Sequence, residues 1–119
     1  MREIKFRAWE SSIGKMREVT ELEFRDKLVA VCHSDTKGVA VGLIVGEHCE
    51  LMQFTGLHDK NGVEIYEGDI LEHDLKMMTS FVMEWDAEKA MFTQYHPKYT
   101  IEVIGNIYEN PELLGSDSA

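Results

Sequence analysis

The stretch "MQFTGLHDKNGVEIYEGDILEH", residues 52–73, decides the fold of this chain. The tetrapeptide DKNG at residues 59–62 is a strong reversal signal, because Asn and Gly tolerate the positive φ that tight turns need. Gly68 permits a second, sharp bend. Asp69 can direct its carboxylate to nearby backbone N–H groups and so anchor the strand that follows. The stretch therefore predicts strands joined by tight turns, with side chains that serve folding.

The sequence before this stretch predicts two β-hairpins. In "IKFRAW", residues 4–9, apolar and polar residues alternate, which is typical of a half-buried strand. A second extended run begins at Met16, so we expect a first hairpin over residues 3–24. Two apolar runs on either side of the turn at residues 34–38 predict a second hairpin. Its glycines, at positions 42 and 46, indicate bends, a bulge or the close approach of another backbone.

The sequence after this stretch predicts three more strands and a helical turn. Two strands are expected around the turn at residues 86–89, with Phe81, Met83 and Trp85 on one face. A last strand is expected over residues 100–108. The pair Asn110-Pro111 then begins a helical turn, with Asn as its cap and Pro at the first helical position. Residues 116–119 are expected to form a frayed tail.

Many short strands, tight turns and little helix predict a mainly β fold built as a small all-β barrel. The succession of strand, turn, bend, Gly-Asp and strand is also how many SH3-like barrels are laid out. The residues expected to act as structural turn residues are Gly56, Asp59, Asn61, Gly62, Gly68, Asp69, Gly105, Asn110 and Pro111.

The charge of the chain is strongly acidic and uneven. Its 119 residues, enough for one domain or a small barrel with an appended element, carry 12 Lys and Arg against 22 Asp and Glu, a net charge of −10. Residues 1–17 hold five basic and two acidic side chains, a local +3, which leaves −13 for the rest. An acidic body repels phosphate backbones, so general nucleic-acid binding is not expected. No apolar stretch is long enough to cross a bilayer, and no apolar signal core stands at the start, which predicts a cytosolic protein.

The acidic run after the decisive turn is the one candidate for metal chemistry. Carboxylates two apart on a strand share a face and can ligate Mg²⁺ or form an acid/base pair. The period of two expected for a solvated strand accounts for the same residues, so we predict no metal and no cofactor. The candidate ligands are Glu67, Asp69, Glu72 and Asp74.

The two cysteines do not make an active site on this pattern. Cys32-His33 and His48-Cys49 are neighbours on expected strands and point to opposite faces, so neither pair brings a base to a thiol or two ligands to one zinc ion. The Gly-x-Ser-x-Gly elbow and the phosphate-binding loop are also missing from the sequence. We therefore predict a protein that is not an enzyme.

The first strand carries the candidate interaction residues Lys5, Arg7 and Trp9, which share its outward face. An aromatic ring beside Arg is a common anchor at protein interfaces, although a Trp here could equally pack over a barrel end. The basic first segment and the acidic body predict a homo-oligomer, held by charge complementarity or by strand exchange through the first hairpin. An alternative is an acidic mimic of DNA that inhibits a host DNA-binding protein.

Three blocks of the sequence together resemble the YopX family of phage and prophage proteins. They are "MREIKFRAW" at residues 1–9, "MQFTGLHDKNGVEIYEGDIL" at residues 52–71 and "VIGNIYENPELL" at residues 103–114. His58 departs from the family pattern, where Lys is frequent, and Val63 departs because a polar residue is usual there. The family has no established biochemical activity to transfer.

The resemblance implies an N-terminal β extension over residues 1–50, an SH3-like barrel over residues 51–115 and a tail over residues 116–119. It also implies a phage-encoded product in the cytoplasm of a bacterial host. We therefore expect a non-enzymatic protein–protein interaction or self-assembling module, whose partner is a second copy or a host or phage protein. The alternatives are the DNA mimic and, as a second alternative, a divalent-metal-dependent enzyme.

Overall fold

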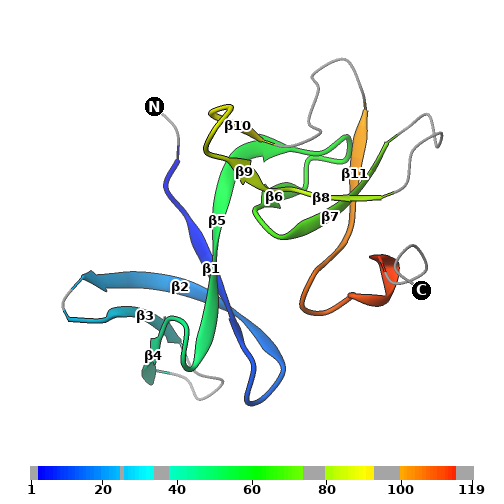
Figure 1. Ribbon diagram of the computed structural model, residues 1–119. Helices are drawn as coiled ribbons and strands as arrows, with labels where there is room; N and C mark the ends of the chain where they lie inside the picture. Colours follow the sequence, from blue (N-terminus) through cyan, green and yellow to red (C-terminus); the bar gives the residue numbers. More distant parts are fainter. Residues whose placement is uncertain (1–2, 25, 34–37, 74–79, 93–99, 115–119) are drawn as a thin grey trace. The chain divides into compact units, whose positions relative to one another are not determined.

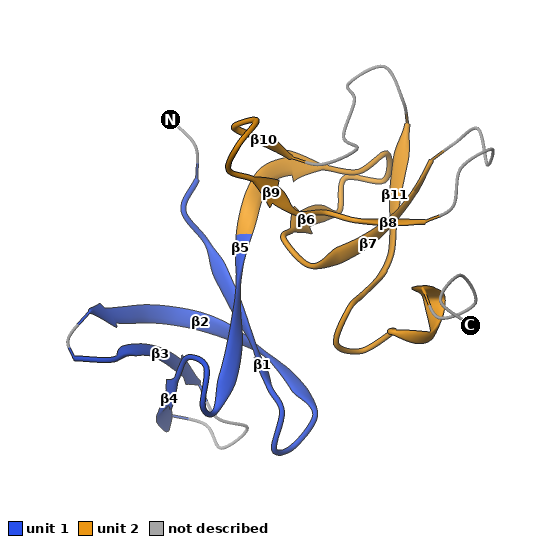
Figure 2. Ribbon diagram, viewed as in Figure 1, with its two compact units in different colours: residues 1–53 blue, residues 54–119 orange. Residues whose placement is uncertain are grey.

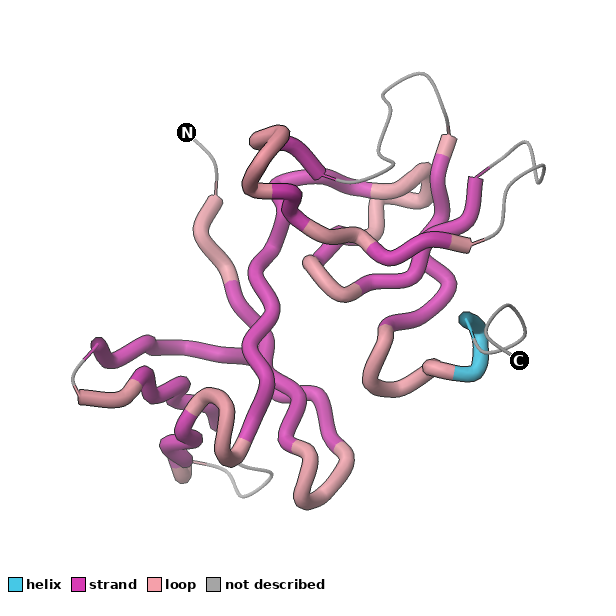
Figure 3. Tube along the Cα trace, viewed as in Figure 1, coloured by secondary structure: helices cyan, strands magenta, loops and turns pink. Residues whose placement is uncertain are grey.

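The structure, a computed structural model, is mainly β (Figures 1 and 3). It describes residues 3–24, 26–33, 38–73, 80–92 and 100–114. The chain forms two compact units, residues 1–53 (unit 1) and residues 54–119 (unit 2), which Figure 2 shows in blue and orange. Strand β5 (Cys49–His58) begins in unit 1 and ends in unit 2.

Unit 1 is a sheet of antiparallel strands in the order β4-β3-β2-β1-β5. The predicted first hairpin consists of β1 (Phe6–Glu10) and β2 (Lys15–Phe24), which pair from Arg7 opposite Glu18 to Glu10 opposite Lys15. The predicted second hairpin consists of β3 (Leu28–His33) and β4 (Ala40–Ile44). The first part of β5 then pairs with β1 on its other side.

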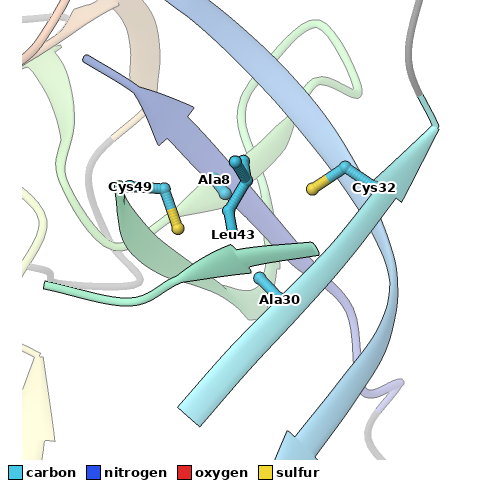
Figure 4. Packing of buried hydrophobic residues seen from close by; sticks show 5 residues of the cluster. All are labelled: Ala8, Ala30, Cys32, Leu43 and Cys49. Atoms are coloured by element: carbon cyan, nitrogen blue, oxygen red, sulfur yellow. The ribbon is translucent and has the colours of Figure 1, made fainter. Parts of the chain in front are cut away.

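The core of unit 1 is small because short side chains build it. Figure 4 shows its buried cluster of five residues, Ala8, Ala30, Cys32, Leu43 and Cys49, which come from β1, β3, β4 and β5. Met52 of β5 is also buried, outside this cluster. The apolar residues that pack partly buried against this cluster are Val19, Leu22, Val41, Val45 and Leu51. Strand pairing therefore contributes much of the order in unit 1, since few large side chains are fully buried there.

Unit 2 contains the remaining strands. The end of β5 pairs with β6 (Glu64–Tyr66), the two being joined by the predicted turn at residues 59–62. Strand β7 (Asp69–His73) lies between β8 (Phe81–Val82) and β11 (Ile101–Asn106). Strands β9 (Trp85–Asp86) and β10 (Met91–Phe92) form a separate hairpin. A helical turn covers residues 112–114.

The core of unit 2 is made of larger side chains than that of unit 1. One buried cluster contains Ile65, Leu71, Phe81, Met83 and Ile101. The expectation that Trp85 shares their face is wrong, because its side chain is 48% exposed. The reason is that β8 ends at Val82 and β9 pairs with β10, so the alternation of a single strand does not continue to residue 85.

The predicted closed barrel is not seen in the described part of unit 2. Its strands form open sheets: β5 with β6, β9 with β10, and β11 with β7 and β8. Within the described ranges β11 pairs with β7 alone, and β8, β9 and β10 are each two residues long, which gives too little edge to close a barrel. The predicted tail at residues 116–119 lies outside the described residues.

Candidate functional site

The predicted interaction residues Arg7 and Trp9 lie in β1, between β2 and β5, and are half-buried. Trp9 is opposite Met16 on one side and Glu50 on the other. A Cβ atom at Gly14 would lie 4.0 Å from the Trp9 ring, so the indole reaches back to the hairpin turn. Both residues therefore belong to a central strand of the unit 1 sheet, and their side chains are only partly exposed.

A groove lies beside the third predicted residue, Lys5. It has a volume of about 230 Å³ and is lined by Ile4, Lys5 and Phe6 on one side and by residues 19–22 of β2 on the other. The Lys5 Nζ lies 3.6 Å from a Glu3 carboxylate oxygen. The sequence reasoning missed this groove, because it depends on how far β1 and β2 stay paired.

Unit 1 also exposes large apolar side chains, one of which lines the groove. Ile4, which lines it, is 77% exposed, and Phe24 at the end of β2, two residues beyond the last lining residue, is 78% exposed. Ile13, in the turn between β1 and β2 and outside the lining of the groove, is 50% exposed. Single exposed apolar side chains are ordinary, and Ile4 differs from the others because it lies on the wall of a groove.

In unit 2 the predicted turn residue Asp59 binds three backbone amides. Its Oδ1 accepts hydrogen bonds from Asn61 N–H at 2.8 Å and from Val63 N–H at 2.9 Å. Its Oδ2 accepts one from Val103 N–H at 3.0 Å, across to β11. Burial of the carboxyl raises its pKa, but the hydrogen bonds from Val103, Val63 and Asn61 together lower it, so that the pKa lies below the ordinary 3.8. Asp59 therefore fixes the turn and ties it to a strand 44 residues away.

Asp69, predicted both as a turn residue and as a metal candidate, is 1% exposed and binds the backbone. Its Oδ2 accepts a hydrogen bond from Tyr66 N–H at 2.8 Å. The preceding Gly68 has φ +94° and donates its N–H to Met83 O at 2.8 Å. This geometry joins β6, β7 and the segment after β8 around one bend.

The other metal candidates are not brought together with Asp69 in a ligand set. Glu67 lies before the bend, and Glu72 is half-buried in β7, opposite Glu102 of β11. Asp74 lies outside the described residues. Within the described ranges no group of three or more His, Cys, Asp or Glu side chains is placed to hold a metal ion.

Two predicted glycines sit where the backbone needs a positive φ. Gly62 has φ +82° in the turn after Asp59. Gly56 has φ +86° at the point where the pairing of β5 with β6 shifts register between Phe54 and Leu57. Residues with a Cβ rarely adopt these angles, so both positions favour glycine.

Gly105 is required for a different reason, a close approach. A Cβ atom there would lie 2.6 Å from the Asn110 Oδ1. That oxygen accepts a hydrogen bond from Asn106 N–H at 3.3 Å, a contact toward the preceding strand rather than the helix cap we expected. The Asn110 and Pro111 carbonyls accept hydrogen bonds from residues 113 and 114, which closes the helical turn.

Asn106 is a structural residue that sequence reasoning missed. Its Oδ1 accepts hydrogen bonds from Tyr108 N–H at 3.0 Å and Glu109 N–H at 2.8 Å. Its Nδ2 donates to the Glu109 Oε1 at 2.9 Å. The sequence signal that could have identified Asn106 is an Asn at the end of a predicted strand, because Asx turns are common there.

The cysteines of unit 1 are free, buried thiols on different strands. Burial raises the pKa of Cys32, against the smaller opposing effect of the Arg17 charge. Burial also raises the pKa of Cys49, to about 11. Thiols with raised pKa values are poor nucleophiles at neutral pH, so these two side chains act as core residues.

Residues 5–115 match the family described as YopX protein. The chain belongs to the YopX family. Among solved structures it is similar to the crystal structure of protein EF1440 from Enterococcus faecalis, with 29% sequence identity and a TM-score of 0.64. That likeness covers 96% of this chain and 99% of the other, so it extends over nearly the whole length of both.

Two further findings concern curated relatives and membrane-spanning helices. A comparison with curated proteins gave no match. Among the described residues no helix has the length and apolar character needed to cross a membrane.

Proposed function

We propose that this YopX protein is a non-enzymatic contact module that assembles with copies of itself in the cytoplasm of a bacterial host, as a phage or prophage product. The observation that carries the proposal is a groove of mixed polar and apolar lining in unit 1, with the largely exposed Ile4 on its wall and the exposed Phe24 two residues beyond it in β2. Apolar anchors of this kind provide much of the binding energy at protein interfaces.

The charge distribution supports self-association. The first 17 residues carry a net +3 and the rest of the chain −13, so the basic segment of one copy is attracted to the acidic surface of another. Two whole chains of charge −10 repel one another, which favours a contact that uses the basic segment specifically.

The use of the acidic side chains in unit 2 supports a role other than catalysis. Asp59 and Asp69 bind backbone amides of their own turns and strands. The three backbone hydrogen bonds to Asp59 lower the pKa of its carboxyl, which makes it a weak base. The hydrogen bonds of these two carboxylates therefore give both residues a structural role, and the proposal assigns them no reaction.

The test is the molar mass of the purified chain, measured by multi-angle light scattering over a range of concentrations. We expect a mass above the 13.7 kDa of one chain at low salt, and a weaker association at about 100 mM salt, where charges are screened over roughly 10 Å. A monomer under both conditions at all concentrations would overturn the proposal.

A further inference from the structure

Strand β2 is longer than the strand beside it. β1 pairs with β2 only as far as Arg7 opposite Glu18. The remaining residues of β2, from Val19 to Phe24, pair with β3 on the other side, with a register shift between Val19 and Glu21. A register shift of this kind increases the local twist of a strand. In the described residues, the β1-side edge of β2 beyond Glu18 thus has no paired strand.

The groove of unit 1 lies along this open edge. Figure 1 shows the segment before β1 and the second half of β2 diverging, and the groove of about 230 Å³ lies between residues 4–6 and residues 19–22. An unpaired strand edge is a template on which another extended segment can add as a strand. An apolar wall beside the edge, here Ile4, Phe6 and Leu22, gives the added segment side-chain contacts as well.

We propose that the groove binds residues 3–5 of a second copy. In this exchange, the segment before β1 of each copy inserts between the same segment and β2 of the other copy, and it extends that β2. This inference rests on the proposed self-association and names its surface and its partner. Ile4 is the apolar anchor, since it is largely exposed in one copy and reaches the groove of the other on exchange. The insertion is reciprocal, so the same contact is made twice in a two-fold symmetric pair.

Charge identifies the occupant as this chain's own basic segment. The open half of β2 carries Glu21 and Glu23, with Glu18 just before it, and it has no basic residue. The segment before and into β1 carries Lys5 and Arg7, against Glu3. An acidic strand edge therefore meets a segment that alternates basic and apolar residues, whereas two β2 edges placed together would repel.

The first arm of the test makes the same substitution at two isoleucines, both of which are exposed in a single copy. Ile4→Asp places a charge on the proposed anchor, and the control Ile13→Asp makes the same change on an exposed residue in the turn between β1 and β2. We expect Ile4→Asp to raise the dimer dissociation constant by about tenfold or more, as loss of an apolar anchor does. Ile13→Asp should change it by less than about threefold. Both variants should keep the circular dichroism spectrum of the parent, and at concentrations low enough for the monomer they should also keep its melting curve.

The second arm exchanges charges between copies. Lys5→Glu and Glu21→Lys should each weaken the dimer, because like charges then meet at both contacts. An equimolar mixture of the two variants should recover it, since each mixed pair places opposite charges together at both grooves. If the two residues interacted only within one chain, the mixture would not recover.

The outcomes separate this inference from the proposed function. A dimer that is insensitive to Ile4→Asp, that is equally weakened by Ile13→Asp, or that does not form from the mixed variants overturns the exchange while self-assembly stands. A parent chain that is monomeric throughout overturns both.

Discussion

The two units of this protein use polar residues in opposite ways. The buried polar side chains of the described residues all lie in unit 2, and they are Thr55, Asp59, Asp69, His73 and Asn106. The buried core of unit 1 contains two alanines, two cysteines and a leucine. Unit 2 therefore fixes its turns with side chain–backbone hydrogen bonds, whereas unit 1 depends on strand pairing around a small apolar core.

Among the described residues each unit exposes four large apolar side chains, so the two units differ in their buried residues and not in this count. In unit 2 the metal candidate Asp69 and the turn residue Asp59 accept hydrogen bonds from the backbone, and large apolar residues such as Leu71 and Met83 are fully buried. Unit 1 leaves Ile4 and Phe24 exposed beside a strand edge. The proposed contact is placed in unit 1 because the groove and the open edge of β2 occur there beside the exposed Ile4.

The largest effect is expected from removing the carboxylate that holds the turn of unit 2. Asp59→Ala deprives three backbone N–H groups of their acceptor. Hydrogen bonds to charged groups contribute roughly 1.5–3 kcal/mol each and are not additive, so we expect a loss of about 3 kcal/mol in the free energy of unfolding. Urea denaturation followed by circular dichroism measures it.

The control is Asp86→Ala, which removes an Asx turn in the exposed loop between β9 and β10. Asp86 Oδ1 accepts hydrogen bonds from Glu88 and Lys89 N–H, both in solvent-exposed surroundings. Its loss should cost about 1 kcal/mol or less, because water replaces the acceptor. Equal losses in the free energy of unfolding would show that the hydrogen bonds of Asp59 contribute no more to stability than those of the exposed Asx turn.

The same carboxylate predicts a dependence on pH. The pKa of Asp59 is lowered in the folded chain relative to 3.8, so the unfolded chain binds the proton more readily. The resulting stabilisation is present above about pH 4–5 and is lost as the pH falls below 3.8 through the folded pKa. Denaturation of the parent and of Asp59→Asn between pH 6 and pH 2 should give curves that converge at low pH, and parallel curves would contradict the assignment.

The sequence predicted local features of this fold well and long-range ones poorly. The turn at residues 59–62 and the hairpins of unit 1 follow from turn residues and the period of two, which act over a few positions. The hydrogen bond from Val103 to Asp59 spans 44 residues, and no local pattern encodes it. The groove was missed for the same reason, since it depends on where β1 and β2 part and not on the composition of either strand.

A smaller effect, about equal in the two units, is expected from their turn glycines. Gly62 in unit 2 and Gly46 in unit 1 have φ values of +82° and +93°, and an added Cβ would meet no atom within 4 Å at either position. The cost of Gly62→Ala or Gly46→Ala is therefore backbone strain alone, about 1–2 kcal/mol. Urea denaturation monitored by the two tryptophans, Trp9 in unit 1 and Trp85 in unit 2, measures it.

Fluorescence from one tryptophan at a time shows whether the two units unfold together. Replacing Trp85 by Phe in the parent and in both variants leaves Trp9 as the reporter of unit 1. If the units unfold together, both substitutions shift the Trp9 transition equally. If unit 1 unfolds first, Gly46→Ala alone shifts it. An unchanged stability in both variants would contradict the requirement for positive φ.

The last prediction perturbs stability least and reports on unit 1 directly through its thiols. With its pKa raised to about 11, Cys49 has about a hundredfold less thiolate at pH 8 than a cysteine at the ordinary 9.0. We expect a disulfide reagent such as 5,5′-dithiobis(2-nitrobenzoic acid) to label the native chain at least about a hundred times more slowly than the urea-unfolded chain. Cys32→Ser isolates the signal of Cys49.

The rate of this labelling distinguishes two ways in which a small core can behave. If unit 1 opens on its own, the thiol reacts faster than the whole chain unfolds, because local opening needs less free energy than global unfolding. If the small core is held as firmly as that of unit 2, labelling follows the global unfolding equilibrium, and Asp59→Ala in the other unit accelerates it. Native labelling as fast as that of the unfolded chain would mean that Cys49 is not buried. That result would contradict its place in the core of unit 1.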